Sequence, residues 1–479
     1  MHAQYPKMPQ IKCEADTFEL TSKSNPDVDS FVLAGGDNFI GATKEKNKLV
    51  SPFLNETKVE YSALGNHDVD RVATFQDNLE NTDTKFLAAN MKRTGVTPFD
   101  KYLDDKRIVS STIVEKNGHK YGIVGAAPFK LSSSKQLKKA NLSVEKYEKT
   151  RDNVQAEVKK LQEQGIDKII MVSHLGYAND FKLAQEVSGI DVIVGGHSHD
   201  LVEGLTPGKN IVTAPDGNPV IITQAGQNGE FTGKLDVTFD KSGKIIAATN
   251  KVKSTKDAPK SVVIKFFEDR ILGKATPMGT LTRVDEMNGN SKVVENPYAN
   301  FFADAMKNEL GADVALVNSA NIRGKLATGP LTDLDIKNLI PFENTLVKVE
   351  LSEKQVVDSL KDGAKSVHDG MLKPGIMQVA GLRYKIDKQG NLSEVKIQNK
   401  DGSFASIDTK NPSEDKKYTA IIDEFLLSSD EYPTLNQAKV IEKYDFDKTK
   451  VAQDYIQKLD QNNLQVKLDG RIENESVTQ

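Results

Sequence analysis

Side chains able to bind a metal ion recur at four places in the first half of the chain. The sequence has only 7 histidines among its 479 residues, yet these four places hold four of them. Imidazole nitrogens, carboxylates and amide oxygens together suit cations such as Zn, Mn, Fe, Ni or Co. The places are residues 35–38 (Gly-Gly-Asp-Asn), 65–68 (Gly-Asn-His-Asp), 173–174 (Ser-His) and 195–199 (Gly-Gly-His-Ser-His).

This set of ligands predicts a pair of divalent cations. A carboxylate such as Asp37 can bridge two ions, and Asn66 offers a neutral amide oxygen. Two metals about 3.5–4 Å apart activate a water molecule and hold both oxygens of an in-line displacement at phosphorus. The indicated reaction is therefore hydrolysis of a phosphoester.

His67 differs from the other histidines because Asp70 follows it three residues later. A carboxylate at that distance can orient an imidazolium ring. We predict that His67 stabilises charge in the transition state or protonates the leaving group. Any one of these motifs alone also fits an ordinary surface or core histidine, as we predict for His119 and His368, and only their joint occurrence favours a site.

Each of the four places follows a predicted strand, at residues 31–34, 59–63, 168–172 and 191–194. Short β-rich runs alternate with helical segments up to about residue 245, which is typical of an α/β layered domain. In such sheets ligands bind beyond the carboxyl ends of the strands. We therefore expect one cluster to contain Asp37, Asn66, His67, His174, His197 and His199.

Other local signals complete the predicted organisation. Asn117-Gly118 joins two strand-like runs, 108–116 and 119–125, as a hairpin. Helices are predicted around residues 8–18, 143–164 and 261–272, and Ser352 with Gln355 forms a capping box that opens another helix. Residues 246–274, which begin with a stretch rich in Lys, Ser and Thr, are predicted to be a linker with an interdomain helix, and residues 473–479 a frayed tail.

Composition excludes several classes of protein and site. The 64 Lys+Arg nearly balance the 68 Asp+Glu, and a net charge of −4 gives no reason to expect a nucleic-acid polymer as the partner. The single cysteine, Cys13, excludes a disulfide framework and thiolate-built metal sites. No apolar run approaches the roughly 18 residues of a membrane span. The sequence does not indicate an oligomeric state.

These motifs resemble those of the 5′-nucleotidase and UDP-sugar hydrolase family, with its calcineurin-like metallophosphoesterase domain. The resemblance implies an α/β fold: a layered metallophosphoesterase β-sandwich flanked by helices, joined by a helical linker to a second α/β nucleotide-binding domain. The implied domains are residues 1–245 and 275–472. Besides the four metal-binding places, the motifs that carry it are 316–323 (Leu-Val-Asn-Ser-Ala-Asn-Ile-Arg), 341–346 (Pro-Phe-Glu-Asn-Thr-Leu), 381–384 (Gly-Leu-Arg-Tyr) and 418–432.

The resemblance also implies roles for the metal ligands. Asp37 would bridge the two ions, which would be Zn, Mn, Co or similar, and His67 with Asp70 would be the catalytic dyad. The family opens with an Asp-x-His motif, in which His2 would be the histidine; we expect the aspartate and the strand before it to lie upstream of this chain. One metal would be held by Asn66, His174 and His197, and the other by His2 and His199.

In this family the second domain holds the substrate, a nucleotide or nucleotide derivative. Phe342 and Phe425 match the aromatic pair that stacks on the base, and Asn318, Arg323 and Asp430 match groups near the base, ribose or phosphates. The implied activity is that of a 5′-nucleotidase. A 2′,3′-cyclic nucleotide phosphodiesterase/3′-nucleotidase, a UDP-sugar hydrolase, a non-catalytic nucleotide-binding protein and an inactive fragment stay open as alternatives.

Two cellular locations are compatible with the sequence. By resemblance the protein would be periplasmic or extracellular. The chain shows no signal peptide, so a cytoplasmic location stays open.

Overall fold

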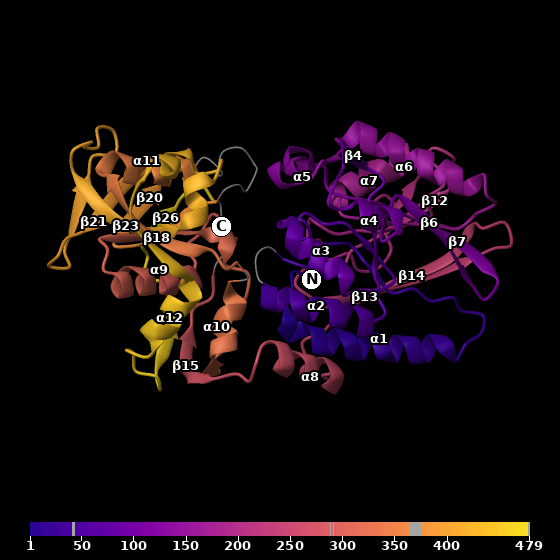
Figure 1. The fold of residues 1–479 in the computed structure, drawn as a ribbon, viewed down its shortest axis with the longest axis horizontal. Helices are drawn as coiled ribbons and strands as arrows, with labels where there is room; N and C mark the ends of the chain where they lie inside the picture. Colours follow the sequence, from indigo (N-terminus) through magenta and orange to yellow (C-terminus); the bar gives the residue numbers. More distant parts are fainter. Residues whose placement is uncertain (41–43, 288, 291, 341, 365–374, 478–479) are drawn as a thin grey trace. The chain divides into compact units, whose positions relative to one another are not determined.

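The computed structural model describes residues 1–40, 44–287, 289–290, 292–340, 342–364 and 375–477, so Gly41, Pro341 and His368 lie outside the described residues. It divides into two compact units, Met1–Gly273 and Lys274–Gln479 (Figure 1). Each unit has its own sheets and its own hydrophobic clusters. Among the described helices, none combines the length and the apolar character needed to cross a bilayer.

Two sheets form the frame of the amino-terminal unit. The smaller sheet is parallel throughout, and the larger is mixed, with antiparallel strands at its two edges. The smaller sheet has the order β1 (Leu33–Ala34), β2 (Tyr61–Ala63), β3 (Lys85–Leu87), β5 (Ile108–Val109). The larger has the order β11 (Ile211–Thr213), β12 (Pro219–Thr223), β10 (Val192–Val194), β9 (Ile169–Ser173), β7 (His119–Ala126), β6 (Ser111–Lys116).

The two sheets pack on one another, and helices cover the far face of the larger one. Tyr61 and Leu87 of the smaller sheet share a buried cluster with Ile123 of the larger. A second cluster joins the larger sheet to α6 (Tyr147–Gln162) and α7 (Tyr177–Glu186). The predicted β-sandwich flanked by helices is therefore confirmed.

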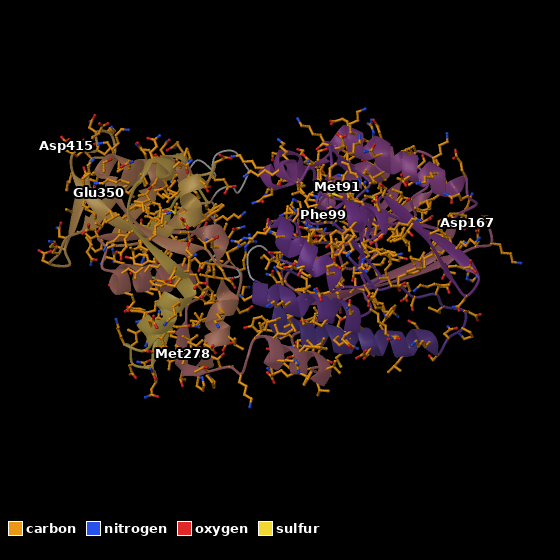
Figure 2. All side chains as sticks on the ribbon, viewed as in Figure 1. Met91, Phe99, Asp167, Met278, Glu350 and Asp415 are labelled. Atoms are coloured by element: carbon orange, nitrogen blue, oxygen red, sulfur yellow. The ribbon has the colours of Figure 1, made fainter. Side chains whose placement is uncertain are left out.

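Further helices border the sandwich. Figure 1 shows α8 (Val262–Ile271) beside α1 (Met8–Lys23) and α2 (Lys44–Glu56), with which it is in contact. Phe99, labelled in Figure 2, packs its ring 5.8 Å from that of Phe75. The remaining elements of this unit are β4 (Met91–Arg93), β8 (Leu142–Val144), α3 (Val72–Glu80), α4 (Asp100–Asp104) and α5 (Lys135–Lys139).

Two predicted boundaries, those of the linker and of the tail, differ in the structure. Residues 246–254, predicted as linker, belong to β14 (Ile245–Ser254), which pairs with β13 (Phe231–Phe239) in a ribbon. Most of this ribbon's side chains are not buried, so its composition is as polar as that of a linker. The predicted frayed tail begins inside β26 (Ile472–Asn474), which pairs with β20 (Leu382–Ile386).

The predicted hairpin at Asn117-Gly118 is confirmed for β6 and β7, which pair from Ser111↔Val124 to Lys116↔His119. Its first two predicted residues, Ile108 and Val109, instead form β5 in the other sheet. The chain crosses from one sheet to the other between these strands, and local propensity carries no signal for that crossing.

The carboxyl-terminal unit is built on a five-stranded mixed sheet. Its order is β19 (Met377–Ala380), β16 (Val314–Asn318), β23 (Lys417–Asp423), β18 (Thr345–Ser352), β24 (Lys439–Asp447). Along β16, Val314 and Leu316 belong to one buried cluster while Ala315 and Val317 belong to another. Since alternate residues of a strand face opposite sides, this sheet is buried on both faces.

Helices and two further sheets surround the five-stranded sheet. The predicted capping box is confirmed at the start of α11 (Glu353–Ala364), where Ser352 N donates to Gln355 Oε1 (2.9 Å) and Gln355 N to Ser352 Oγ (3.1 Å). The helices are α9 (Pro297–Leu310), α10 (Asp333–Leu339), α11 (Glu353–Ala364) and α12 (Lys448–Ile456). The further sheets contain β15 (Pro277–Val284), β17 (Gly329–Thr332) and β25 (Leu464–Val466), and β20 (Leu382–Ile386), β21 (Leu392–Gln398), β22 (Phe404–Ile407) and β26.

Candidate functional site

The loops after β1, β2, β9 and β10 meet at one end of the sandwich. Asp37 follows β1 in the smaller sheet, whereas His174 follows β9 in the larger one. Their side chains nevertheless touch, with His174 Nε2 3.0 Å from Asp37 Oδ2. The structure therefore brings together ligands that lie far apart in the chain.

Asp37 is the centre of this site. Its Oδ2 lies 3.3 Å from His2 Nε2, and its Oδ1 accepts a hydrogen bond of 2.8 Å from the backbone N–H of His67. The donor atoms of His2, Asp37 and His67 lie within 4.8 Å of one another, and so do those of Asp37, His174 and His197. Two three-residue clusters thus share one carboxylate.

The imidazole rings are packed closely around it. The rings of His174 and His197 have centroids 5.0 Å apart, and His2 lies 5.2 Å from His199 and 5.4 Å from His67. Every histidine predicted in this site is therefore in contact with another member of it.

The loop backbones are specialised for this crowding. A Cβ on Gly65 would lie 2.1 Å from Asp37 Oδ1, and one on Gly196 would lie 2.1 Å from the Gly35 carbonyl oxygen, so only glycine fits at these positions. Asp37, His197 and His199 adopt positive φ angles of 52°, 76° and 66°. Non-glycine residues in this region are strained, and such strain gathers at functional sites.

Burial keeps two of the histidines neutral. It lowers the pKa of His2 to about 3, and burial together with the charge of His174 lowers the pKa of His197 to about 4. A neutral imidazole carries the lone pair that a metal ligand needs. These two rings are therefore in the binding form at neutral pH.

The carboxylates of the site have opposite tendencies. Burial favours a protonated Asp37, but the charges of His174 and His67 outweigh it and hold the pKa of Asp37 well below its usual range. Burial and the neighbouring charge of Asp37 raise the pKa of Asp68 to about 6. Burial lowers the pKa of His174, yet the charge of Asp37 outweighs it and the pKa is raised. Asp37 is therefore the anionic centre of the cluster.

Asn66 provides the test of whether a cation fits here. Its side chain is buried, and its Oδ1 has no hydrogen-bond partner within the part of the chain that the structure describes. A buried amide oxygen without a partner is costly and requires an explanation, of which a bound ion is one. The nitrogen and oxygen donors of Asp37 and the clustered histidines are those that borderline divalent cations prefer. The residues present therefore fit a divalent metal centre.

His67 and Asp70 form the predicted pair. His67 Nδ1 lies 2.7 Å from Asp70 Oδ2, and both side chains are partly exposed. The backbone of His67 is fixed by its bond to Asp37, so the ring stands at the edge of the cluster with its carboxylate partner outside it.

In the carboxyl-terminal unit, the predicted substrate residues lie at one edge of the five-stranded sheet. Asn318 ends β16, Phe342 precedes β18 and Phe425 follows β23. β16 runs parallel to β23 and β18 antiparallel to it, so these positions share an edge.

The side chains at this edge differ in their surroundings. Phe425 is 47% exposed. Phe342 is partly buried, and the Arg323 guanidinium lies 5.9 Å from the centre of its ring. Asn318 is buried and its Oδ1 accepts from Ala320 N (2.8 Å), whereas Asp430 is exposed.

Comparison with known proteins places both units. Residues 1–201 match the calcineurin-like phosphoesterase family and residues 276–437 match the 5′-nucleotidase C-terminal domain, which together account for most of the chain. The chain belongs to the 5′-nucleotidase family. As a member of the metallophosphoesterases it is a phosphoester hydrolase, and enzymes of this class use divalent metals.

Individual relatives in the 5′-nucleotidase family are distant in sequence. A probable 5′-nucleotidase of Treponema pallidum (strain Nichols) is 25% identical over 80% of this chain and 76% of its own length. A trifunctional nucleotide phosphoesterase of Bacillus subtilis (strain 168) is 27% identical over 81% of this chain, which spans only 26% of that longer protein. The crystal structure of a 5′-nucleotidase precursor from Thermus thermophilus shares the fold, with a TM-score of 0.77, 24% identity and coverage of 98% of this chain and 93% of its own.

The structure adds residues to this 5′-nucleotidase-type site that the sequence analysis did not single out. Asp68 accepts hydrogen bonds from the backbone N–H groups of Asp37 (3.2 Å), Phe39 (3.0 Å) and Gly65 (2.8 Å), and thereby ties two ligand loops together. Its place beside His67 in the motif could have drawn attention to it. Asn228, 3.2 Å from His2 Nδ1, comes from a distant loop without any motif.

Proposed function

We propose that this protein hydrolyses nucleotide phosphoesters, as a 5′-nucleotidase does, with two divalent metal ions in its amino-terminal unit. The observation that carries this proposal is the carboxylate of Asp37 shared by two clusters of histidines. One cluster alone would fit a single structural ion. Two clusters on one bridging carboxylate are what a two-metal centre requires.

The ligand assignment follows the two clusters. His174 and His197 form one cluster with Asp37, and we assign the unpartnered amide oxygen of Asn66 to the same ion. In the other cluster His2 faces Asp37, and we assign His199, whose ring lies 5.2 Å from that of His2, as the second histidine ligand in place of His67, which has the separate role described below. When bound, the ions would supply an activated water molecule and offset negative charge at phosphorus.

Two of the histidine ligands are oriented by hydrogen bonds to their Nδ1 atoms. His174 Nδ1 lies 2.5 Å from the Gly35 carbonyl oxygen, so Nδ1 carries the proton and Nε2 is the atom directed at the site. His2 Nδ1 is held in the same way by the Asn228 Oδ1. Both imidazoles are thus oriented by the folded chain before any ion binds.

His67 has the role of a proton-holding group. Asp70 accepts the hydrogen bond from Nδ1, which leaves Nε2 as the atom through which His67 would hold a proton near a substrate oxygen. A charged imidazole there stabilises negative charge or protonates the departing oxygen. Asp70 maintains the orientation of the ring.

The carboxyl-terminal unit would select the nucleotide. An exposed phenylalanine such as Phe425 provides a face on which any base can stack, worth about 1–3 kcal/mol. Phe342 would face the other side of the base, Arg323 and Asp430 would meet polar groups of the ligand, and Asn318 supports the loop between them.

Turnover with four substrates tests the proposal. AMP, UDP-glucose, 2′,3′-cyclic AMP and p-nitrophenyl phosphate are assayed with Mn²⁺ or Co²⁺ and with a chelator. We expect AMP hydrolysis that needs the metal. Binding of AMP without hydrolysis of any substrate would contradict the proposal and favour a nucleotide-binding protein. Hydrolysis of p-nitrophenyl phosphate alone would show a phosphoesterase whose substrate is not a nucleotide, and would contradict that part of the proposal.

A broader substrate range is the second candidate. It is favoured by the 27% identity to a relative that is itself described as a trifunctional nucleotide phosphoesterase. In the same assay, a kcat/KM for 2′,3′-cyclic AMP above that for AMP would favour this candidate. By resemblance to the family we also propose an exported location, which fractionation of the native cells would test.

A further inference from the structure

A lysine, an aspartate and an asparagine form a buried polar triad beneath the predicted substrate edge of the carboxyl-terminal unit. Lys448 and Asp423 are fully buried, and Asn321 is 6% exposed. Lys448 Nζ donates to Asp423 Oδ1, and Asn321 Nδ2 donates to Asp423 Oδ2 at 2.8 Å. One carboxylate thus joins two side chains from different parts of the chain.

The triad connects three strand ends of the five-stranded sheet. Asn321 lies just after β16, Asp423 is the last residue of β23, and Lys448 immediately follows β24. β18 lies between β23 and β24 in the sheet, so the lysine reaches across one strand to its partner. The three residues are therefore brought together by the tertiary fold.

Each of the two predicted binding segments, 316–323 and 418–432, contains one member of the triad close to a predicted substrate residue. Asn321 is two residues before Arg323, and Asp423 is two residues before Phe425. The first segment is bonded within itself, because Arg323 Nε donates to the Ala320 carbonyl (2.8 Å). The bond from Asn321 to Asp423 then joins this compact loop to the second segment.

Stability alone does not account for such a group. Burying an ion pair costs about as much as its charges recover, and apolar residues of similar size often serve equally well. A buried carboxylate with two directed partners does, however, fix the geometry of whatever is attached to it. The side chain of Asn321 is buried and bonded to Asp423, so it is not part of the exposed surface of the loop.

We propose that the Lys448–Asp423–Asn321 triad positions the two nucleotide-recognition segments relative to each other, with Asp423 as the positioning residue. This inference rests on the proposed function, since it assigns the segments to nucleotide recognition. It predicts that loosening the triad weakens recognition of the nucleotide while the hydrolytic chemistry of the amino-terminal unit is retained.

The test uses Asn321→Ala in the full chain, because this change removes one hydrogen bond and leaves both charges paired. Asn300→Ala is the matched control, since Asn300 is also buried and donates to a buried carboxylate, that of Glu295 (2.6 Å). The double variant Asp423→Asn/Lys448→Met removes both buried charges together. Each protein is compared by thermal unfolding, by hydrogen exchange of residues 319–323 and 424–428, and by KM and kcat.

We expect Asn321→Ala to raise the KM for AMP about tenfold with kcat nearly unchanged, and to leave KM and kcat for p-nitrophenyl phosphate unchanged. Both segments should exchange faster in Asn321→Ala and in the double variant, but not in Asn300→Ala. Equal exchange in all variants, or a KM change shared by both substrates, would overturn the inference. If the unsubstituted protein neither binds nor hydrolyses AMP, the proposed function fails instead, and unchanged exchange would overturn the positioning role separately.

Discussion

Asp37, Asn66 and His174 of the amino-terminal unit are buried, whereas the key aromatic residue of the carboxyl-terminal unit lies at a surface. Asp37 is 3% exposed and His174 2% exposed, but Phe425 is 47% exposed. The first site contains a buried amide oxygen, that of Asn66, with no partner among the described residues. At the second edge, Asn318 and Asp423 already have partners within the protein.

This difference separates two ways of preparing for a ligand. Buried donors with one missing partner and shifted pKa values are suited to a small cation, because the ion replaces the missing interaction. An exposed ring on a fixed support is suited to a base, whose flat face needs area more than directed bonds. We infer that chemistry is concentrated in the first unit and selection in the second.

The strongest way to break this comparison is to remove the charge at the centre of the first site. We expect Asp37→Asn to lower kcat by on the order of 10³-fold or more, because both clusters lose their shared anionic ligand. Metal content measured by mass spectrometry should fall in parallel. Asp29→Asn is the control, since Asp29 also accepts bonds from several side chains but at a distant place, and it should keep both metal and activity.

A smaller effect is expected at the dyad beside the metal ligands. His67→Gln and Asp70→Asn should lower kcat by roughly 10²–10³-fold, because a positioned acid or charge-stabilising group contributes about that much. Unlike Asp37→Asn, they should retain bound metal. Loss of metal in both variants would show that His67 is a ligand and would contradict the dyad assignment.

The third expectation concerns the second unit. Phe425→Ala and Phe342→Ala should raise the KM for AMP about tenfold while kcat changes little, since stacking stabilises bound substrate and transition state alike. Leu substitutions at the same positions separate loss of the ring from loss of apolar volume. An unchanged KM in both Ala variants would remove the stacking assignment and leave the metal centre untouched.

The smallest expected effect compares two carboxylates, one in each unit: Asp191 is partly buried and Asp423 fully buried. Burial raises the pKa of Asp191 to about 7, and its Oδ2 accepts one backbone bond from Ile169 N (2.7 Å). Asp423 is instead paired with Lys448. Between about pH 4 and 7 only the folded state protonates Asp191, so unfolding releases a proton and this group makes the protein less stable as pH rises.

The unsubstituted protein should therefore lose stability from pH 5 to pH 8 relative to Asp191→Asn. We expect the difference between their free energies of unfolding to change by about 1–2 kcal/mol over this range, in favour of the variant. Asp423→Asn should lose stability at both values, because Lys448 would be left as an unpaired buried charge. Denaturant unfolding at the two pH values measures both differences. An exposed control, Asp236→Asn, should show no pH-dependent change.

Much of the local structure followed from sequence patterns. The Asn117-Gly118 hairpin and the Ser352–Gln355 capping box were predictable because turn type and helix start depend on a few adjacent residues. Strand β14 was mistaken for a linker because it belongs to a two-stranded ribbon whose side chains are mostly not buried, and such a strand lacks the hydrophobic alternation that marks a half-buried strand. Strand β26 was missed because three residues carry too little pattern.

The candidate metal centre was predictable in its membership more than in its support. Asp37, His174 and His197 follow predicted strands, and the carboxyl ends of strands converge in α/β sheets. The support from Asn228 and the Gly35 carbonyl depends on loops that no local pattern connects. The same holds for Lys448, whose burial beside Asp423 is the opposite of what composition suggests for a lysine.

The sequence by itself determined which residue types stand at the ends of the strands, because glycine, histidine and aspartate were legible there without any coordinates. Only the tertiary structure decided that Asp37 is shared by two clusters and that Asn66 is left with an oxygen that has no partner among the described residues. The physical reason is that ligand types are a local property of the chain. Burial, shared contacts and missing partners arise only when segments far apart in the chain pack against one another.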